Sequence, residues 1–139
     1  MITYKPDTET RNIKITHSFS VLPIITADTV QLELAIFNII NNAIEAMPNG
    51  GLIDIRTYLE REDGREYVVI KISDTGKGIP EKKLRRLGDL SDNGSRKEKG
   101  YGIFLSREIV KSHNGKIFWE SLMNKGTTFI IRIPVKQNG

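Results

Sequence analysis

The chain has 139 residues, a formal charge of +4, 38% hydrophobic residues and no cysteine. This length and hydrophobic content suit one folded domain, and the lack of cysteine excludes disulfide frameworks, thiolate zinc sites and cysteine nucleophiles. No apolar run reaches the roughly 18–20 residues of a transmembrane helix, and no signal peptide opens the chain. We therefore expect one cytoplasmic domain over residues 1–139 without direct membrane contact, although its parent protein can still be anchored in a membrane.

The positive charge is concentrated in one segment. Residues 82–99 contain seven basic and three acidic residues, which leaves the rest of the chain neutral. Such a segment suits a polyanion, for example the phosphates of a nucleotide, but a solvated loop has the same composition. Trp119 and the tyrosines are not interleaved with the basic residues, so we expect no nucleic-acid binding.

The N-terminal part of the chain predicts strands followed by a helix. Residues 1–11 are polar and fit a tail or an edge strand, whereas residues 12–19 alternate between apolar and polar side chains as a strand does. Residues 21–25, which are interrupted by Pro23, fit a short edge strand. Asp28 precedes the helical periodicity and predicts the N-cap, and the sequence PNGG at positions 48–51 predicts the end of the helix.

The helix predicted over residues 30–47 is the most informative element of the sequence. Most of its side chains are apolar, so we expect it to be buried. A polar seam runs along it at a spacing of three or four residues, through Gln31, Ala35, Asn38, Asn42 and Glu45. The carboxamides of Asn38 and Asn42 need partners, because an unpaired buried polar group costs about 1–3 kcal/mol. They either bond each other and a nearby loop or face a polar ligand such as Mg²⁺.

The remaining elements combine hairpins with short helices. We expect strands at residues 52–60 and 66–73 around a turn at 61–64, and strands at 116–122 and 127–135 around a turn at 123–126. A short basic helix at 81–87, a mobile polar loop at 88–100 and a helix at 101–112 lie between the hairpins. This order favours an α+β fold, a two-layer sandwich with a mixed, mostly antiparallel sheet of about five strands and about three helices on one face.

A first glycine motif, DTGKGIP at positions 74–80, follows an apolar strand. The carboxylate of Asp74 can accept a hydrogen bond from an exocyclic amine, and Gly76 and Gly78 let the backbone approach a flat ring and adopt positive φ. Ile79 can pack on the face of that ring. An ordinary turn has the same composition, so this motif alone leaves both interpretations open.

A second glycine motif, GYGI at positions 100–103, opens the helix that follows the loop. Glycines at a helix N-terminus expose backbone N–H groups toward an anion, which the helix dipole also favours. Lys97 and Lys99 precede the motif and add positive charge. The alternative is a plain exit from a flexible loop, and the sequence contains no Walker loop.

Taken together, in this order and spacing, the NxxxN pair Asn38 and Asn42 and the two glycine motifs resemble the N, G1 and G2 boxes of the sensor histidine kinases. Residues 126–134, with the sequence GTTFIIRIP, resemble the closing strand of that family. The resemblance extends over about residues 28–135. It implies an ATP-binding catalytic domain of the Bergerat (gyrase, Hsp90, histidine kinase, MutL) fold, with residues 88–100 as a flexible lid over the ATP.

The resemblance also implies a role for each matching residue. Asn42 is expected to hold Mg²⁺ and Asn38 to contact phosphate or metal, and both would be catalytic. Asp74 is expected to bind the adenine amine, with support from Thr127 through water. The other implied ATP-binding residues are Gly76, Gly78, Ile79, Lys97, Lys99, Gly100, Tyr101, Gly102 and Ile103.

Some residues depart from the family pattern. Glu98 stands where many members carry a further glycine in the G2 box, and residues 87–90 replace the phenylalanine pair of the F box with the sequence LGDL. The contacts of the lid are therefore left open. Glu45 occupies a position where many members have a basic or amide residue, so we do not assign it to phosphate binding.

Asn38 also affects the expected reaction. The ATPases of this fold resemble one another in having a glutamate at this position, which activates water, whereas an amide cannot take up a proton. The resemblance therefore implies transfer of the γ-phosphoryl group to a histidine on a separate dimerisation domain, absent from this chain, and then to a response regulator. Neither His17 nor His113 fits that acceptor. A water-activating ATPase, a serine kinase of the anti-sigma type and a nucleotide-free interaction module remain as alternatives.

Overall fold

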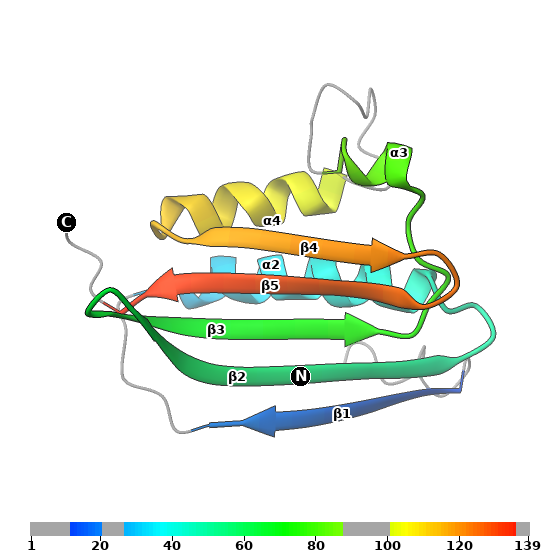
Figure 1. Cartoon of the computed structure of the whole chain (residues 1–139), viewed down its shortest axis with the longest axis horizontal. Helices are drawn as coiled ribbons and strands as arrows, with labels where there is room; N and C mark the ends of the chain where they lie inside the picture. Colours follow the sequence, from blue (N-terminus) through cyan, green and yellow to red (C-terminus); the bar gives the residue numbers. More distant parts are fainter. Residues whose placement is uncertain (1–11, 21–26, 88–100, 136–139) are drawn as a thin grey trace.

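The computed structural model describes residues 12–20, 27–87 and 101–135, which form a two-layer α+β sandwich (Figure 1). Its sheet has five strands in the order β1-β2-β3-β5-β4. The strands are β1 (Ile13–Phe19), β2 (Gly51–Glu62), β3 (Arg65–Asp74), β4 (Lys116–Leu122) and β5 (Gly126–Pro134). β1 runs parallel to β2, and the other neighbouring strands are antiparallel. The predicted mixed, mostly antiparallel sheet is therefore confirmed.

The described helices are α2 (Thr29–Glu45), α3 (Glu81–Leu84) and α4 (Tyr101–Ser112). α2 and α4 lie on one face of the sheet, and α3 lies near the start of α4 (Figure 1). None of the described helices is both long and apolar enough to cross a membrane. The elements predicted at residues 1–11, 21–25 and 88–100 lie outside the described residues.

The structure corrects two predicted boundaries. β2 and β3 remain paired as far as Glu62 and Arg65, so the turn between them consists of Asp63 and Gly64 alone. Both residues have positive φ, at 53° and 79°, as a two-residue hairpin turn requires. α3 ends at Leu84 and not at residue 87. The helix buries no side chain, so packing does not stabilise a further turn.

The hydrophobic core lies between the sheet and the helices. Alternate residues of β5 are buried there, as the period of a strand requires. The side chains that are almost completely buried come from α2, α4 and the inner strands: Ile39, Ile44, Ile53, Ile72, Ile103, Val110, Ile131 and Ile133. Each buried aliphatic side chain contributes about 1.5–3 kcal/mol relative to an exposed one, so this core fixes α2 and α4 against the sheet.

Polar contacts set α2 and α4 antiparallel to each other. The backbone N–H of Asp28 donates to Nε2 of His113 over 3.0 Å, so Nδ1 of His113 is the protonated nitrogen and donates to the carbonyl oxygen of Ile109 over 2.9 Å. Further along the pair, the hydroxyl of Ser106 donates to the carbonyl oxygen of Ala35 over 2.9 Å. Asp28 also caps α2, as predicted, because its side chain accepts a hydrogen bond from the first turn.

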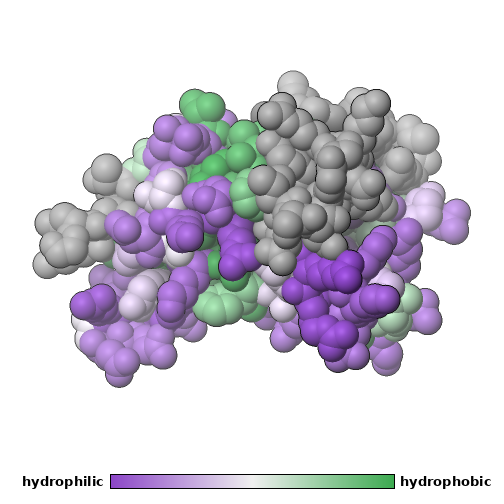
Figure 2. Space-filling model, turned by 90° about the horizontal axis from the view of Figure 1, so that it is seen from above, coloured by the Kyte–Doolittle hydropathy of each residue, from purple (hydrophilic) through white to green (hydrophobic). Residues whose placement is uncertain are grey.

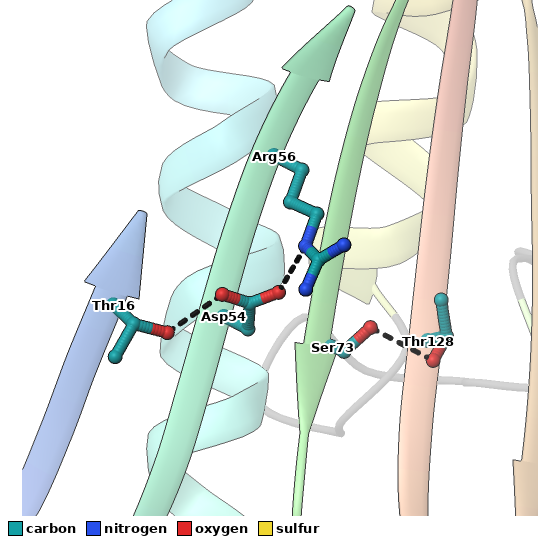
Figure 3. Close-up of polar contacts among 5 residues, drawn as sticks. All are labelled: Thr16, Asp54, Arg56, Ser73 and Thr128. Atoms are coloured by element: carbon teal, nitrogen blue, oxygen red, sulfur yellow. Dashed lines mark hydrogen bonds and ion pairs between the residues drawn. The ribbon is translucent and has the colours of Figure 1, made fainter. Parts of the chain in front are cut away.

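The other face of the sheet carries polar side chains that bond across the strands (Figure 3). Asp54 on β2 accepts from the hydroxyl of Thr16 on β1 over 2.6 Å and from Nε of Arg56 over 2.7 Å. The hydroxyls of Ser73 on β3 and Thr128 on β5 are 3.0 Å apart. Neighbouring residues of a strand point to opposite faces. The side chains of Asp74 and Thr127, which adjoin this last pair, therefore belong to the helix-covered face.

Candidate functional site

Asn38 lies on α2 where that helix passes the start of α4. Its Nδ2 atom is buried and finds no hydrogen-bond partner within the described part of the chain. Gly102 of α4 lies against it, since a Cβ at position 102 would be 3.4 Å from the Cβ and Cγ atoms of Asn38. By contrast, the hydroxyl of Ser106 and the ring of His113 both form hydrogen bonds with the α2 segment. The unpaired Nδ2 atom of Asn38 is therefore a local exception between these helices, one that an ordered water or a ligand can satisfy.

Asn42 follows one helical turn later and is half-buried. Its neighbour Asn41 points elsewhere on the helix, and Nδ2 of Asn41 donates to Oε2 of Glu45 over 3.4 Å. Among the described residues, no group of three His, Cys, Asp or Glu side chains could hold a metal ion. A divalent ion at Asn42 would need further ligands from outside the protein, as Mg²⁺ has when it is bound together with phosphates and water.

Asp74 ends β3 and is half-buried. Its Oδ1 atom accepts from the N–H of Gly76 over 2.8 Å and from the N–H of Thr127 over 3.3 Å. No other described residue bonds this carboxylate, so Oδ2 can accept from another group. Burial raises the pKa of the Asp74 carboxyl, and the two backbone donors act against that rise.

The loop that follows β3 fits between the end of α2 and the β4–β5 turn. A Cβ at Gly76 would lie 2.8 Å from the Cβ of Ala46 on the α2 side. Gly78 has a φ of +80°, and its Cβ would overlap the carbonyl oxygen of Leu122 on the β4 side. The space and the backbone conformation together require glycine at position 78, and the space alone favours it at position 76.

Hydrogen bonds hold this loop from both sides. The N–H of Lys77 donates to the carbonyl oxygen of Ala46 over 3.2 Å, and the carbonyl oxygen of Lys77 accepts from the N–H of Asn124 over 2.8 Å. The N–H of Ile79 donates to Oγ of Ser121 over 2.8 Å. Ser121 is not among the predicted site residues. The register of the β4–β5 hairpin places Ser121 opposite Thr127, and a prediction of that register would have identified Ser121 as part of the site.

The structure brings the predicted site residues together in two groups. One group surrounds Asp74 at the end of the sheet and contains Gly76, Gly78, Ile79 and Thr127. The other group lies on α2 and α4 and contains Asn38, Asn42 and Gly102. Gly76 connects the two groups, because it contacts Ala46 one turn beyond Asn42.

Other predicted residues lie elsewhere or outside the described part of the chain. Ile103 is completely buried in the core, so only its backbone is available to a ligand. Lys97, Lys99 and Gly100 lie outside the described residues, as does the side chain of Tyr101.

Two cavities lie away from these residues. A cavity of about 400 Å³ on the polar face of the sheet is lined in part by Tyr58 and Arg132. A cavity of about 510 Å³ between α3, α4 and β4 is lined in part by Arg85, Arg107 and Trp119. Figure 2 views the molecule from the side of these three elements and shows a band of hydrophobic residues with hydrophilic residues beside it. Neither cavity is lined by a predicted site residue.

Comparison with known proteins identifies relatives of the chain. Residues 27–137 match the family described as histidine kinase-, DNA gyrase B-, and HSP90-like ATPase. Sporulation kinase E of Bacillus subtilis (strain 168) is 38% identical over 117 residues, which cover 84% of this chain and 15% of that protein. Adaptive-response sensory kinase SasA of Synechococcus sp. (strain JA-3-3Ab) is 38% identical over 118 residues, which cover 82% of this chain and 30% of that protein. The chain thus spans less than a third of the length of these relatives.

A solved structure shares the fold. The nucleotide-free catalytic domain of histidine kinase ThkA aligns with a TM-score of 0.78 and 25% identity, over 96% of this chain and 88% of that one. The family match covers α2, both glycine motifs and the closing strand, which are the elements that carry the candidate site. The chain therefore belongs to the histidine kinase-, DNA gyrase B- and HSP90-like ATPase family, in which it is an ATP-binding catalytic domain of the sensor histidine kinase type.

Proposed function

We propose that this domain binds ATP together with Mg²⁺ and transfers the γ-phosphoryl group to a histidine on a separate dimerisation domain of its parent protein. A response regulator would then receive the phosphoryl group in the cytoplasm. The buried and unpaired Nδ2 atom of Asn38 carries this proposal. Such an atom costs a fold about 1–3 kcal/mol, and a phosphate oxygen beside the start of α4 would remove that cost.

The surroundings of Asp74 support the binding of adenine. Its Oδ2 atom can accept a hydrogen bond from the exocyclic amine of the base, while Oδ1 is held by Gly76 and Thr127. The glycines of the loop leave room for a flat ring beside the backbone. Ile79 is half-buried next to them and would pack on one face of the ring.

Asn38 and Asn42 would share the triphosphate end of the nucleotide. Nδ2 of Asn38 is a donor, so it suits a phosphate oxygen and not a metal ion. The side-chain oxygen of Asn42 is the kind of neutral ligand that Mg²⁺ accepts along with phosphate oxygens and water. When bound there, Mg²⁺ supplies charge neutralisation to the phosphates. Backbone N–H groups at the start of α4, with predicted contributions from Lys97 and Lys99, would bind the remaining phosphate oxygens.

Transfer to a protein acceptor suits these residues better than hydrolysis. Asn38 cannot take up a proton as a general base does, and Glu45 is engaged by Asn41. His113 uses both ring nitrogens in hydrogen bonds within the fold. An acceptor histidine outside this chain, on a dimerisation domain, agrees with these observations.

Substitution of Asn42 by alanine tests the metal assignment. Loss of a Mg²⁺ ligand should weaken binding of a nonhydrolysable ATP analogue in the presence of Mg²⁺ by about tenfold, or about 1.4 kcal/mol. Binding without Mg²⁺ should change little, and calorimetric titration measures both. Asn41→Ala is the matched control, because it removes the same side chain from the same helix at a position that bonds Glu45. If the metal strengthens binding equally in the Asn42→Ala variant and the wild type, Asn42 is not its ligand.

Mixing the domain with the dimerisation domain of its parent protein tests the activity. With labelled ATP, we expect acid-labile label on a histidine of the dimerisation domain and none on this chain. Release of phosphate by this domain alone would instead indicate a water-activating ATPase. Acid-stable label on a serine would indicate a serine kinase, and failure to bind nucleotide would indicate an interaction module.

A further inference from the structure

Three polar side chains form one row across the end of the sheet. Ser121 on β4 is opposite Thr127 on β5, and Thr127 is opposite Asp74 on β3. Thr127 is 5% exposed and contacts both neighbours. Its N–H donates to Oδ1 of Asp74 over 3.3 Å, and its hydroxyl lies 2.8 Å from the hydroxyl of Ser121. Ser121 is thus coupled to the proposed nucleotide site through Thr127.

Only one assignment of the two hydroxyl protons allows all three hydrogen bonds of Ser121 to form. The N–H of Ile79 must donate to Oγ of Ser121, over 2.8 Å. The carbonyl oxygen of Gly126 can only accept, so the hydroxyl proton of Ser121 goes to it, over 3.1 Å. Ser121 has no second proton, and the bond between the two hydroxyls must therefore use the proton of Thr127. Oγ1 of Thr127 is left with lone pairs alone.

We infer that Ser121 determines base specificity by holding the hydroxyl of Thr127 as a hydrogen-bond acceptor. This inference rests on the proposed function and makes Ser121 a positioning residue that acts through Thr127. The row contains two acceptors on paired residues, Oγ1 of Thr127 and the free Oδ2 of Asp74. Adenine has an amine at its 6-position, which two acceptors can bind directly or through water. Guanine has a carbonyl oxygen there, which two acceptors repel.

Removal of the Ser121 hydroxyl would release the proton of Thr127. The hydroxyl of Thr127 could then rotate and donate to the carbonyl oxygen of guanine, so discrimination against guanine would decrease. The N–H of Ile79 and the carbonyl oxygen of Gly126 would also lose a partner, which lowers stability. That loss of stability affects the binding of both nucleotides alike, so it can be separated from the change in specificity.

The test compares Ser121→Ala with the wild-type chain in the presence of Mg²⁺. Calorimetry gives the dissociation constants of nonhydrolysable ATP and GTP analogues, and thermal unfolding is recorded in parallel. The preference for the ATP analogue should decrease about tenfold, the effect of one hydrogen bond, and Ser121→Thr, which keeps a hydroxyl, should restore it. Ser73→Ala is the matched control, because it removes a hydroxyl pair between β3 and β5 on the opposite face of the sheet. The preference of Ser73→Ala for the ATP analogue over the GTP analogue should equal that of the wild type.

Each outcome has a separate meaning. If Ser121→Ala keeps the full preference for the ATP analogue, this inference is overturned and the proposed function stands. If the wild-type chain binds neither analogue, the proposed function fails and this inference fails with it. Should Ser121→Ala not fold, Ser121→Cys decides, because it keeps the shape of the side chain and replaces the hydroxyl by a thiol that bonds Thr127 only weakly. A reduced preference for the ATP analogue in that variant supports the inference, and its full retention overturns the inference.

Discussion

Asp74 carries a charge in a place where burial disfavours it. Burial raises the pKa of its carboxyl, while the N–H groups of Gly76 and Thr127 stabilise the ionised form. Because the pKa is raised in the folded state, the folded chain binds a proton more readily than the unfolded chain between the ordinary aspartate pKa and the raised one. The contribution of Asp74 to stability is therefore fully present at low pH and is lost as the pH rises through that interval.

Substitution of Asp74 by asparagine should leave stability at neutral pH unchanged or slightly raised. The amide oxygen can still accept both backbone N–H groups, and no buried charge remains. Urea unfolding at a series of pH values should show that the variant lacks the fall in stability that begins near the ordinary aspartate pKa of about 4. The ATP analogue should lose more affinity than the GTP analogue, because the amide adds a donor where the adenine amine needs an acceptor. Identical pH profiles and equal losses for both nucleotides would contradict this account of Asp74.

Among the elements, α2 and α4 show how a helix pair forms one end of the site. The contacts of Ser106 and His113 fix the two helices relative to each other. This alignment brings Gly102 against Asn38 and leaves the amide of Asn38 buried without a partner. The site therefore depends on a small residue at the start of α4, and not only on the polar residue of α2.

The Gly102→Ala variant should keep the stability of the fold while it weakens binding of the ATP analogue. Alanine is favoured over glycine within a helix by up to about 1 kcal/mol. The new methyl group would lie at 3.4 Å from Asn38, which is an ordinary contact, so the fold should be kept. We expect an unchanged or higher melting temperature together with weaker binding of the ATP analogue, because the methyl group would occupy space beside the Asn38 side chain that a phosphate needs. Affinity equal to that of the wild type would show that no phosphate binds between these two residues.

The boundaries of the elements were predictable where a local pattern decides them. β4 and α4 begin and end at the predicted residues, because their apolar spacing is visible within each segment. The turn between β2 and β3 was predicted too long, since charged residues such as Glu62 and Arg65 join the strands only through pairing with each other. Local polarity indicates a loop there, and strand pairing overrides it.

Contacts between distant segments of the site could not be predicted. The polar seam of α2 and the carboxylate at the end of β3 follow from spacing. The partners of Ser121 and His113 do not, because Ile79 lies 42 residues from Ser121 and Asp28 lies 85 residues from His113. Such contacts depend on how the helices are placed on the sheet, which no single segment encodes.

In the molecule as a whole, His113 joins the two ends of the helix layer. It is 7% exposed and links the cap of α2 to the last turn of α4. A buried ring whose nitrogens are both engaged has no free nucleophilic atom. This agrees with the prediction that His113 is not the phosphate acceptor, and it gives the residue a structural role.

Replacement of His113 by alanine should lower the free energy of unfolding by about 2–4 kcal/mol, because it leaves a cavity and removes the partner of the Asp28 N–H group. Urea unfolding measures this loss, and His113→Gln, which can keep part of the bonding, should lose less. Well below the unfolding transition, His113→Ala should still phosphorylate the dimerisation domain. A folded variant that has lost this activity would give His113 a part in the reaction.

The hairpin turn of Asp63 and Gly64 is a suitable place to attach a label to this molecule. It lies at the opposite end of the ten-residue strand β3 from Asp74, a separation of about 33 Å. Asp63 is exposed and already carries a side chain in this turn, whereas Gly64 has a φ of +79° that favours glycine. Because the chain has no cysteine, a single Asp63→Cys substitution would be a unique point for a fluorescent dye or a surface tether, well clear of the end where nucleotides are expected to dock.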